Sequence, residues 1–124
     1  MKPSTFDLEE QRLAKEVRRR RSKLVLIQLP EGLKPQGPRL AETVEKAGAT
    51  SIISADPCYG ACDPAEEEAK NLKADLLVHY GHSEIRQTGR RRRIPTIYID
   101  AEARLSPVAA LRKTLHLIKS WNRV

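Results

Sequence analysis

The chain has 124 residues, of which 40% are hydrophobic and 31% are charged. This length suits one average domain, and no apolar run approaches the roughly 20 residues of a membrane-spanning helix. We therefore expect no membrane segment. The polar N-terminal stretch is unlike a signal peptide, and two cysteines are too few for a secreted disulfide scaffold, so the sequence predicts a cytoplasmic protein.

Basic residues outnumber acidic ones by 23 to 16, for a formal net charge of +7. Part of the excess lies in two arginine runs, Arg18 to Arg21 and Arg90 to Arg93. Runs of this kind attract polyanions, although most are simply solvated. Aromatic residues, on which single-stranded RNA stacks, make up only 4% of the chain. The residues expected to make any contact with RNA are Arg90, Arg91, Arg92 and Arg93.

Helical and strand-like hydrophobic patterns alternate along the chain. In order, they predict a helix around Leu13 and Val17, a strand over 23–29, a helix over 39–47, a strand over 51–55, a helix over 64–73, strands over 75–80 and 95–100, and a helix from 107 to about 121. Asp63 and Pro64 are expected to begin the third helix, as its N-cap and first residue. The connection through Pro35 and Pro38 is expected to be an extended, stiff loop.

The alternation of strands and helices predicts an α/β fold. We expect residues 1–124 to form a single three-layer domain, with a four-stranded parallel sheet and helices on both faces. In such sheets, ligands bind beyond the carboxyl ends of the strands. The unusual residues of this chain, at 30–32, 56–63 and 81–83, all follow predicted strands. The sequence therefore predicts a site at one rim of the sheet.

Two cysteines, Cys58 and Cys62, lie four positions apart just before the third predicted helix. A thiol at a helix N-terminus has a lowered pKa, so we expect Cys58 to be an accessible thiolate at the rim. Two small buried residues in a tight turn are an equally good interpretation of this spacing. With His79 and His82, Cys58 would make a mixed zinc site, but the pattern favours a hydrogen-bonded core role for His79 and a rim loop for His82. His116 is expected on the surface.

Three segments together resemble a known family: 28–33 (QLPEGL), 56–63 (DPCYGACD) and 74–83 (ADLLVHYGHS). They are similar to the first domain of the diphthamide synthases, the 2-(3-amino-3-carboxypropyl)histidine synthases. The resemblance implies a dimeric enzyme of three similar domains, each of which gives one cysteine to a [4Fe-4S] cluster. It also implies S-adenosylmethionine as cofactor and a radical transfer of its 3-amino-3-carboxypropyl group to a histidine of translation elongation factor 2.

The resemblance assigns roles to individual residues. Cys58 matches the cluster ligand of the first domain, whereas Cys62 matches a cysteine that does not bind the cluster. Together with the element order, it implies the strand order 2-1-3-4, with the four predicted strands numbered along the chain. The residues expected to bind the cofactors are Pro30, Glu31, Gly32, Tyr59, Gly60, His82 and Ser83.

The match covers one domain of the three, and an open cluster needs about three thiolates. Because Cys58 offers one, we expect the chain to be inactive alone and to need a partner chain or a homo-oligomer to complete the site. Two other functions stay open. One is a non-enzymatic basic adaptor that binds RNA or the elongation factor, and the other is a small metal or redox protein that uses Cys58 and Cys62.

Overall fold

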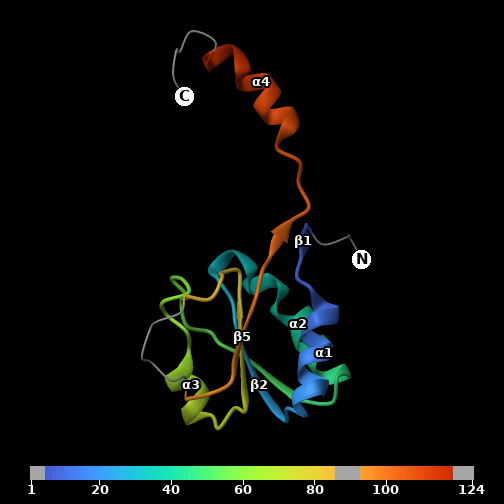
Figure 1. Ribbon diagram of the computed structural model, residues 1–124, viewed down its shortest axis with the longest axis vertical. Coiled ribbons are helices and arrows are strands. Elements are labelled where there is room, and N and C mark those ends of the chain that lie inside the picture. The colour runs from blue at the N-terminus through green and yellow to red at the C-terminus, as the bar shows by residue number, and fades with distance from the viewer. Residues whose placement is uncertain (1–4, 86–92, 119–124) are drawn as a thin grey trace.

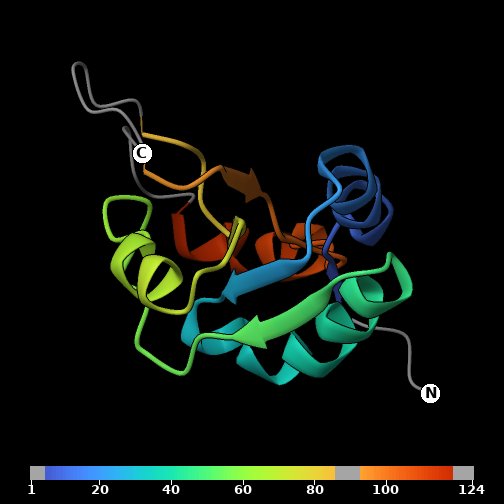
Figure 2. The ribbon, with the colours of Figure 1, turned by 90° about the horizontal axis from the view of Figure 1, so that it is seen from below.

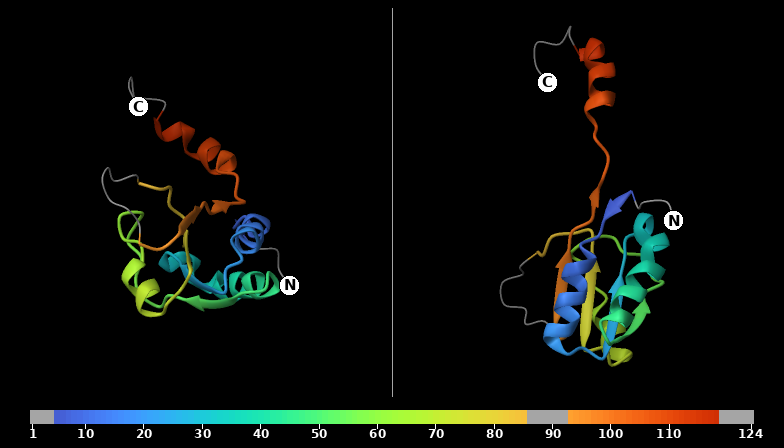
Figure 3. Two further views of the ribbon diagram at one scale, coloured as in Figure 1. Left: turned by 60° about the horizontal axis from the view of Figure 1, so that its bottom comes forward. Right: turned by 90° about the vertical axis from the view of Figure 1, so that its right-hand side faces the viewer.

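A four-stranded sheet forms the centre of the structure, a computed structural model that describes residues 5–85 and 93–118. All neighbouring strands run parallel (Figure 3), and their order is β3-β2-β4-β5. This order is the predicted 2-1-3-4, and it confirms the α/β fold. The strands are β2 (Leu24–Gln28), β3 (Thr50–Ile53), β4 (Leu76–Tyr80) and β5 (Thr96–Ile99).

Helices cover both faces of this sheet (Figures 1 and 2). The helices α1 (Glu10–Arg20) and α2 (Gly37–Lys46) lie on one face, and α3 (Glu66–Asn71) lies on the other. On α1, the buried Leu13 and Val17 are four residues apart, so they share the side that meets the sheet. The expected three layers are therefore present.

The core consists of two clusters, one on each face of the sheet. Successive strand side chains point to opposite faces, so Val25 and Ile27 pack under α1 and α2 while Leu26 packs under α3. All five residues of β4 are buried. A strand covered on both faces is apolar along its whole length, which explains the continuous run at 76–78.

A short ribbon above the sheet pairs the N-terminal segment with the segment that follows β5. In it, β1 (Phe6–Asp7) pairs antiparallel with β6 (Glu102–Ala103). The hydrophobic pattern does not predict this ribbon, because two residues are too few to show a strand periodicity. Nearby, the hydroxyl of the buried Tyr80 donates a hydrogen bond of 3.1 Å to the carbonyl of Leu8, which ties the N-terminal segment to β4.

Two features beside the rim differ from the sequence predictions in kind. Residues 31–36 form a 3-10 helix, η1 (Glu31–Gln36), and α2 begins at Gly37, so the expected extended loop is wrong. The fixed φ of proline suits a first helical turn, which explains how Pro38 starts α2. The predicted cap at Asp63 is also wrong, because α3 begins only at Glu66 and has no side-chain cap.

The C-terminal helix α4 (Val108–Ile118) stands away from the sheet (Figures 1 and 3). Residues 108–117 are exposed, among them His116 as expected. The predicted end of this helix near 121 falls outside the described residues. Within residues 5–85 and 93–118, every helix is too short or too polar to cross a bilayer.

We expect Tyr80→Phe to lower the free energy of unfolding by about 1–2 kcal/mol, because the Leu8 carbonyl loses its buried donor. Burial also raises the pKa of Tyr80, so the hydroxyl stays a neutral donor over the usual pH range. Urea unfolding of both proteins measures the difference. The matched control is Tyr59→Phe, whose side chain is 84% exposed and should change stability by less than about 0.5 kcal/mol. Equal effects of the two variants would contradict the prediction.

Candidate functional site

Three connections meet at the carboxyl rim of the sheet. They follow β2, β3 and β4, and parallel pairing brings the ends of these strands to one edge. The connection after β3 carries Cys58, and the end of β4 carries His79 with His82 just beyond it. The predicted rim site is thus assembled from segments that are far apart in sequence.

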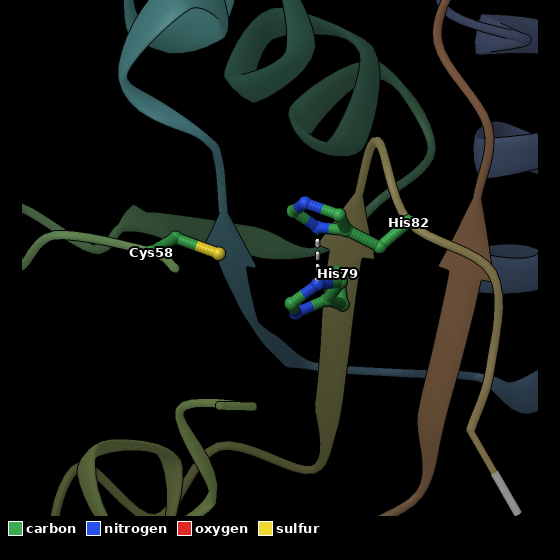
Figure 4. Close-up of side chains that lie close together, drawn as sticks. All are labelled: Cys58, His79 and His82. Carbon is green, nitrogen blue, oxygen red and sulfur yellow. Dashed lines mark hydrogen bonds between the residues drawn. The ribbon is translucent and has the colours of Figure 1, made fainter. Parts of the chain in front are cut away.

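Cys58 faces two neighbouring imidazoles, those of His79 and His82, whose planes are tilted by 47° (Figure 4). The thiol sulfur and one nitrogen of each ring lie within 4.8 Å of one another. His79 is fully buried, Cys58 is only 9% exposed, and His82 is partly exposed. Sequence reasoning considered this trio as a zinc site and favoured a hydrogen-bonded core role for His79, and the structure gives His79 that role.

A buried glutamine, Gln28 at the end of β2, organises this group. Its amide nitrogen donates a hydrogen bond of 2.8 Å to the Asp63 carbonyl, and its Oε1 accepts one of 2.9 Å from the Ala65 N–H. The same Oε1 lies 2.8 Å from Nδ1 of His79. Gln28 therefore links β2, the loop that carries Cys58, and the histidine pair. It also accepts the hydrogen bond from the Ala65 N–H just before α3, where Asp63 was expected to act as the cap.

These contacts define which imidazole nitrogens carry protons. Because Oε1 of Gln28 can only accept, Nδ1 of His79 must be the protonated nitrogen that donates to it. Nε2 of His79 shares a hydrogen bond of 3.0 Å with Nδ1 of His82. A single proton therefore lies between the two rings, on the side that faces the rim.

The expectation of an accessible Cys58 with a lowered pKa is wrong. Burial raises the pKa of the Cys58 thiol, and this effect exceeds the opposing one of a hydrogen bond from the Gly60 N–H. No helix begins beside this thiol, because α3 starts at Glu66, well after the cysteine. The physical reason for the error is thus the late start of the helix, together with the shelter that the rim loops give to the sulfur.

Lys34 is a rim residue that sequence reasoning missed. Its ammonium donates to the carbonyls of Ala55 and Asp56, at 2.7 and 2.9 Å, and pairs with Glu31 at 2.6 Å. It thereby holds η1 against the start of the cysteine loop, and its charge acts to lower the Cys58 pKa. A lone lysine has no sequence signature for such a role. Gln28 was also missed as a site residue, although a polar residue ending an apolar strand is a usable signal.

Gly81 allows the close approach of two rim loops. Its φ is +80°, and a Cβ at this position would lie 3.1 Å from Cγ of Pro30. Glycine avoids both the backbone strain and the steric clash. The loops that carry Pro30 and His82 can therefore lie against each other.

The other predicted site residues spread along the rim. Tyr59 is 84% exposed, and Cys62 lies beside it in an open depression at the start of α3. Ser83 instead lines a separate depression, with Arg12 and Tyr98. Of the remaining expected residues, Glu31 and Gly32 are exposed residues of η1, and Gly60 is a partly exposed residue of the loop that carries Cys58.

Three described arginines of the two runs form ion pairs with glutamates of α1 and α3. Arg90, Arg91 and Arg92 lie outside the described residues, and Arg93 pairs with Glu67 of α3 at 3.3 Å. In the first run, Arg19 and Arg20 both pair with Glu16, which is the ordinary behaviour of a solvated helix face. The RNA contact through Arg90 to Arg93 stays a prediction.

We expect the two thiols to differ in reactivity, because one is sheltered and the other is exposed. In Cys62→Ser, the remaining Cys58 should react slowly with iodoacetamide, with a midpoint pH above the value of about 8.5 of a free cysteine. The matched variant Cys58→Ser leaves Cys62, which should react faster at every pH below that midpoint. A midpoint for Cys58 below that of free cysteine would contradict this prediction.

Comparisons with known proteins agree with this architecture. The family model of diphthamide synthesis proteins matches residues 29–123. A 2-(3-amino-3-carboxypropyl)histidine synthase of Pyrococcus horikoshii is 38% identical over 94% of this chain and 33% of its own length. The subunit 1 of this synthase from Caenorhabditis elegans is 40% identical over 65% of this chain and 21% of its own.

The solved structure of Dph2 from Pyrococcus horikoshii with a 4Fe-4S cluster superposes with a TM-score of 0.80. It is 38% identical, and the match covers 94% of this chain and 34% of that one. The chain thus spans about a third or less of the length of these relatives. Because the family model matches most of the chain and the fold is shared, the chain belongs to the family of diphthamide synthesis proteins.

Proposed function

We propose that residues 1–124 serve as the first domain of a 3-amino-3-carboxypropyl transferase, which carries out the first step of diphthamide biosynthesis. The observation that carries the proposal is the sheltered position of Cys58 at the sheet rim, in a chain 38% identical to a third of an archaeal synthase. The substrate is a histidine of translation elongation factor 2, and the reaction takes place in the cytoplasm. Residues outside the 124 printed here complete the enzyme.

Cys58 is the residue that we assign to an iron–sulfur cluster. Cys58 lies at the rim and is 9% exposed, so the protein shields most of this residue while a small part stays accessible to iron. When bound, a [4Fe-4S] cluster supplies the electron that cleaves S-adenosylmethionine to the 3-amino-3-carboxypropyl radical. Iron binding replaces the thiol proton, so the raised pKa of Cys58 in the metal-free state does not prevent ligation.

The donor set of this chain fits one position of a shared cluster and not a whole one. A cluster with one open iron needs about three protein thiolates, and the chain has Cys58 and Cys62. We assign only Cys58 to the cluster, because Cys62 matches a cysteine that does not bind the cluster in the family that the chain resembles. The other thiolates therefore come from further domains, either on a partner chain or on other copies in a homo-oligomer.

The rim loops around Cys58 are the proposed binding surface for S-adenosylmethionine. Its methionyl part carries an ammonium and a carboxylate, which need paired polar groups and backbone amides. Around Cys58, the rim offers the partly exposed His82, the exposed Glu31 and Gly32 of η1, and Gly60 in the loop of Cys58. The exposed Ser83 follows His82 toward the separate depression. Pro30 and Tyr59 supply apolar surface beside them. Lys34 and Gln28 keep these loops in place through contacts with backbone carbonyls.

The test is a chimera in which this chain replaces the matching third of the Pyrococcus horikoshii synthase. After anaerobic reconstitution with iron and sulfide, we expect the chimera to show the broad visible absorbance of a thiolate-bound cluster and to modify elongation factor 2. The modification is measured as the added mass on the factor. The lone 124-residue chain should hold no stable cluster, because it offers one suitable thiolate.

Matched cysteine variants of the chimera make this test specific. Cys58→Ala should abolish both the cluster and the transfer, whereas Cys62→Ala should weaken them less. Circular dichroism and the oligomeric state show whether each variant is folded. A folded Cys58→Ala chimera with full cluster content would contradict the assignment of Cys58. A stoichiometric, active cluster in the lone chain would contradict the need for further domains.

A further inference from the structure

Cys58, His79 and His82 have a second capability that the cluster assignment does not include. We propose that these three residues bind one Zn²⁺ ion, with a solvent molecule as the fourth ligand, when no cluster occupies Cys58. The proposal rests on the chain's own donor atoms and does not require the proposed function. One thiolate and two imidazoles are ligands that Zn²⁺ prefers, and three protein ligands with one open position are common at zinc sites.

The two imidazole nitrogens are already close to the spacing that a zinc ion needs. Nε2 of His79 and Nδ1 of His82 lie 3.0 Å apart, with one proton between them. Two nitrogens bound to a tetrahedral zinc at about 2.0–2.1 Å lie about 3.3–3.4 Å apart. Replacing the shared proton with Zn²⁺ therefore requires the nitrogens to separate by only a few tenths of an ångström. His82 follows Gly81 in a rim loop, so its ring can make this adjustment.

Gln28 orients the His79 ring so that one of its nitrogens can bind the metal. Zinc-binding histidines usually donate their second N–H to an oxygen, which orients the ring and leaves the other nitrogen to the metal. Nδ1 of His79 donates to Oε1 of Gln28 at 2.8 Å, and that oxygen is held by the Ala65 N–H. Nε2 of His79 is thus the ligand nitrogen, and it lies on the side of His82.

Cys58 completes the ligand set from the opposite loop. Its sulfur points toward the two rings (Figure 4) and lies within 4.8 Å of one nitrogen of each ring. A sulfur and a nitrogen on the same tetrahedral zinc are about 3.5 Å apart, so the loop must approach by about 1 Å. The loop contains Gly60 and an exposed Tyr59, and no described helix or strand constrains the backbone at Cys58.

Cobalt(II) is the probe for this site, because it takes tetrahedral zinc positions and absorbs light. On titration of the reduced lone chain with Co²⁺, we expect one equivalent to produce the visible bands of a tetrahedral centre. A near-ultraviolet band from thiolate-to-cobalt charge transfer should accompany them. Zn²⁺ should then displace the cobalt and remove both signals. If no such bands arise, the histidine pair is only a hydrogen-bonded element of the core and the proposal is overturned.

Variants identify the ligands. Cys58→Ser should remove the charge-transfer band, and His82→Ala should abolish tight binding without disturbing a fully buried side chain. Gln28→Ala should weaken the affinity roughly 10- to 100-fold, as loss of an outer hydrogen bond does at other metal sites. The matched controls Cys62→Ser and His116→Ala should bind like the parent chain. Loss of binding in Cys62→Ser, or unchanged binding in Cys58→Ser or His82→Ala, would overturn this ligand set.

The zinc site and the proposed function fail in different experiments. The cobalt titration uses the lone chain, in which no cluster is expected, and the cluster test uses the chimera. If the lone chain binds zinc but the chimera holds no cluster, the zinc site stands and the proposed function fails. If the chimera holds a cluster but the lone chain binds no cobalt, the proposed function stands and the zinc site fails.

Discussion

The amide of Gln28 is the contact on which the rim depends. It is 3% exposed, at the end of β2, and it contacts the Asp63 carbonyl, the Ala65 N–H and the His79 ring. A buried polar group that lacks partners is costly, so this position tolerates a glutamine only because all its partners are in place. Through Gln28, the loop after β3 is fastened to the two central strands. Removing the amide would leave a carbonyl, an N–H and an imidazole without their partner in a sheltered place.

This arrangement gives Cys58 an unusual environment for a reactive thiol. Activated cysteines generally lie in electropositive, partly exposed positions, where the thiolate is favoured. Cys58 is instead nearly buried, its pKa is raised, and Lys34 opposes that shift only in part. Such a thiol is protected from chance oxidation and alkylation, and it becomes a thiolate when a metal displaces the proton. The site therefore suits a metal ligand better than a nucleophile.

The two proposals concern the same sulfur in two states of assembly. In the proposed function, Cys58 contributes one of the thiolates of a cluster that it shares with the other domains. In the lone chain, His79 and His82 each offer a ring nitrogen within 4.8 Å of the Cys58 sulfur, and imidazoles favour a single borderline metal over an iron–sulfur cluster. The histidine pair thus gives Cys58 an alternative partner, and occupation by zinc would compete with the cluster for the same thiol.

Much of this molecule follows from its sequence, and the rest depends on contacts between distant segments. The alternation of apolar strands and amphipathic helices determined the α/β class, because local periodicity reflects which side chains must be buried. With the three motifs, it also determined the strand order and the placement of Cys58 and His82 at one rim. The short ribbon of β1 and β6 has too few residues to leave a local pattern.

The character of Cys58 was decided by the tertiary structure alone. The sequence indicated an exposed thiolate beside a helix, but Gln28 satisfies the N–H of Ala65 from another strand and α3 begins only at Glu66. Three features depend on residues that the sheet brings together. They are the burial of Cys58, the hydrogen bond between His79 and His82, and the hydrogen bond from Lys34 to the carbonyl of Ala55. Hydrophobic periodicity and motif spacing are local properties of the sequence and do not predict contacts between distant residues, so only the folded chain reveals these contacts.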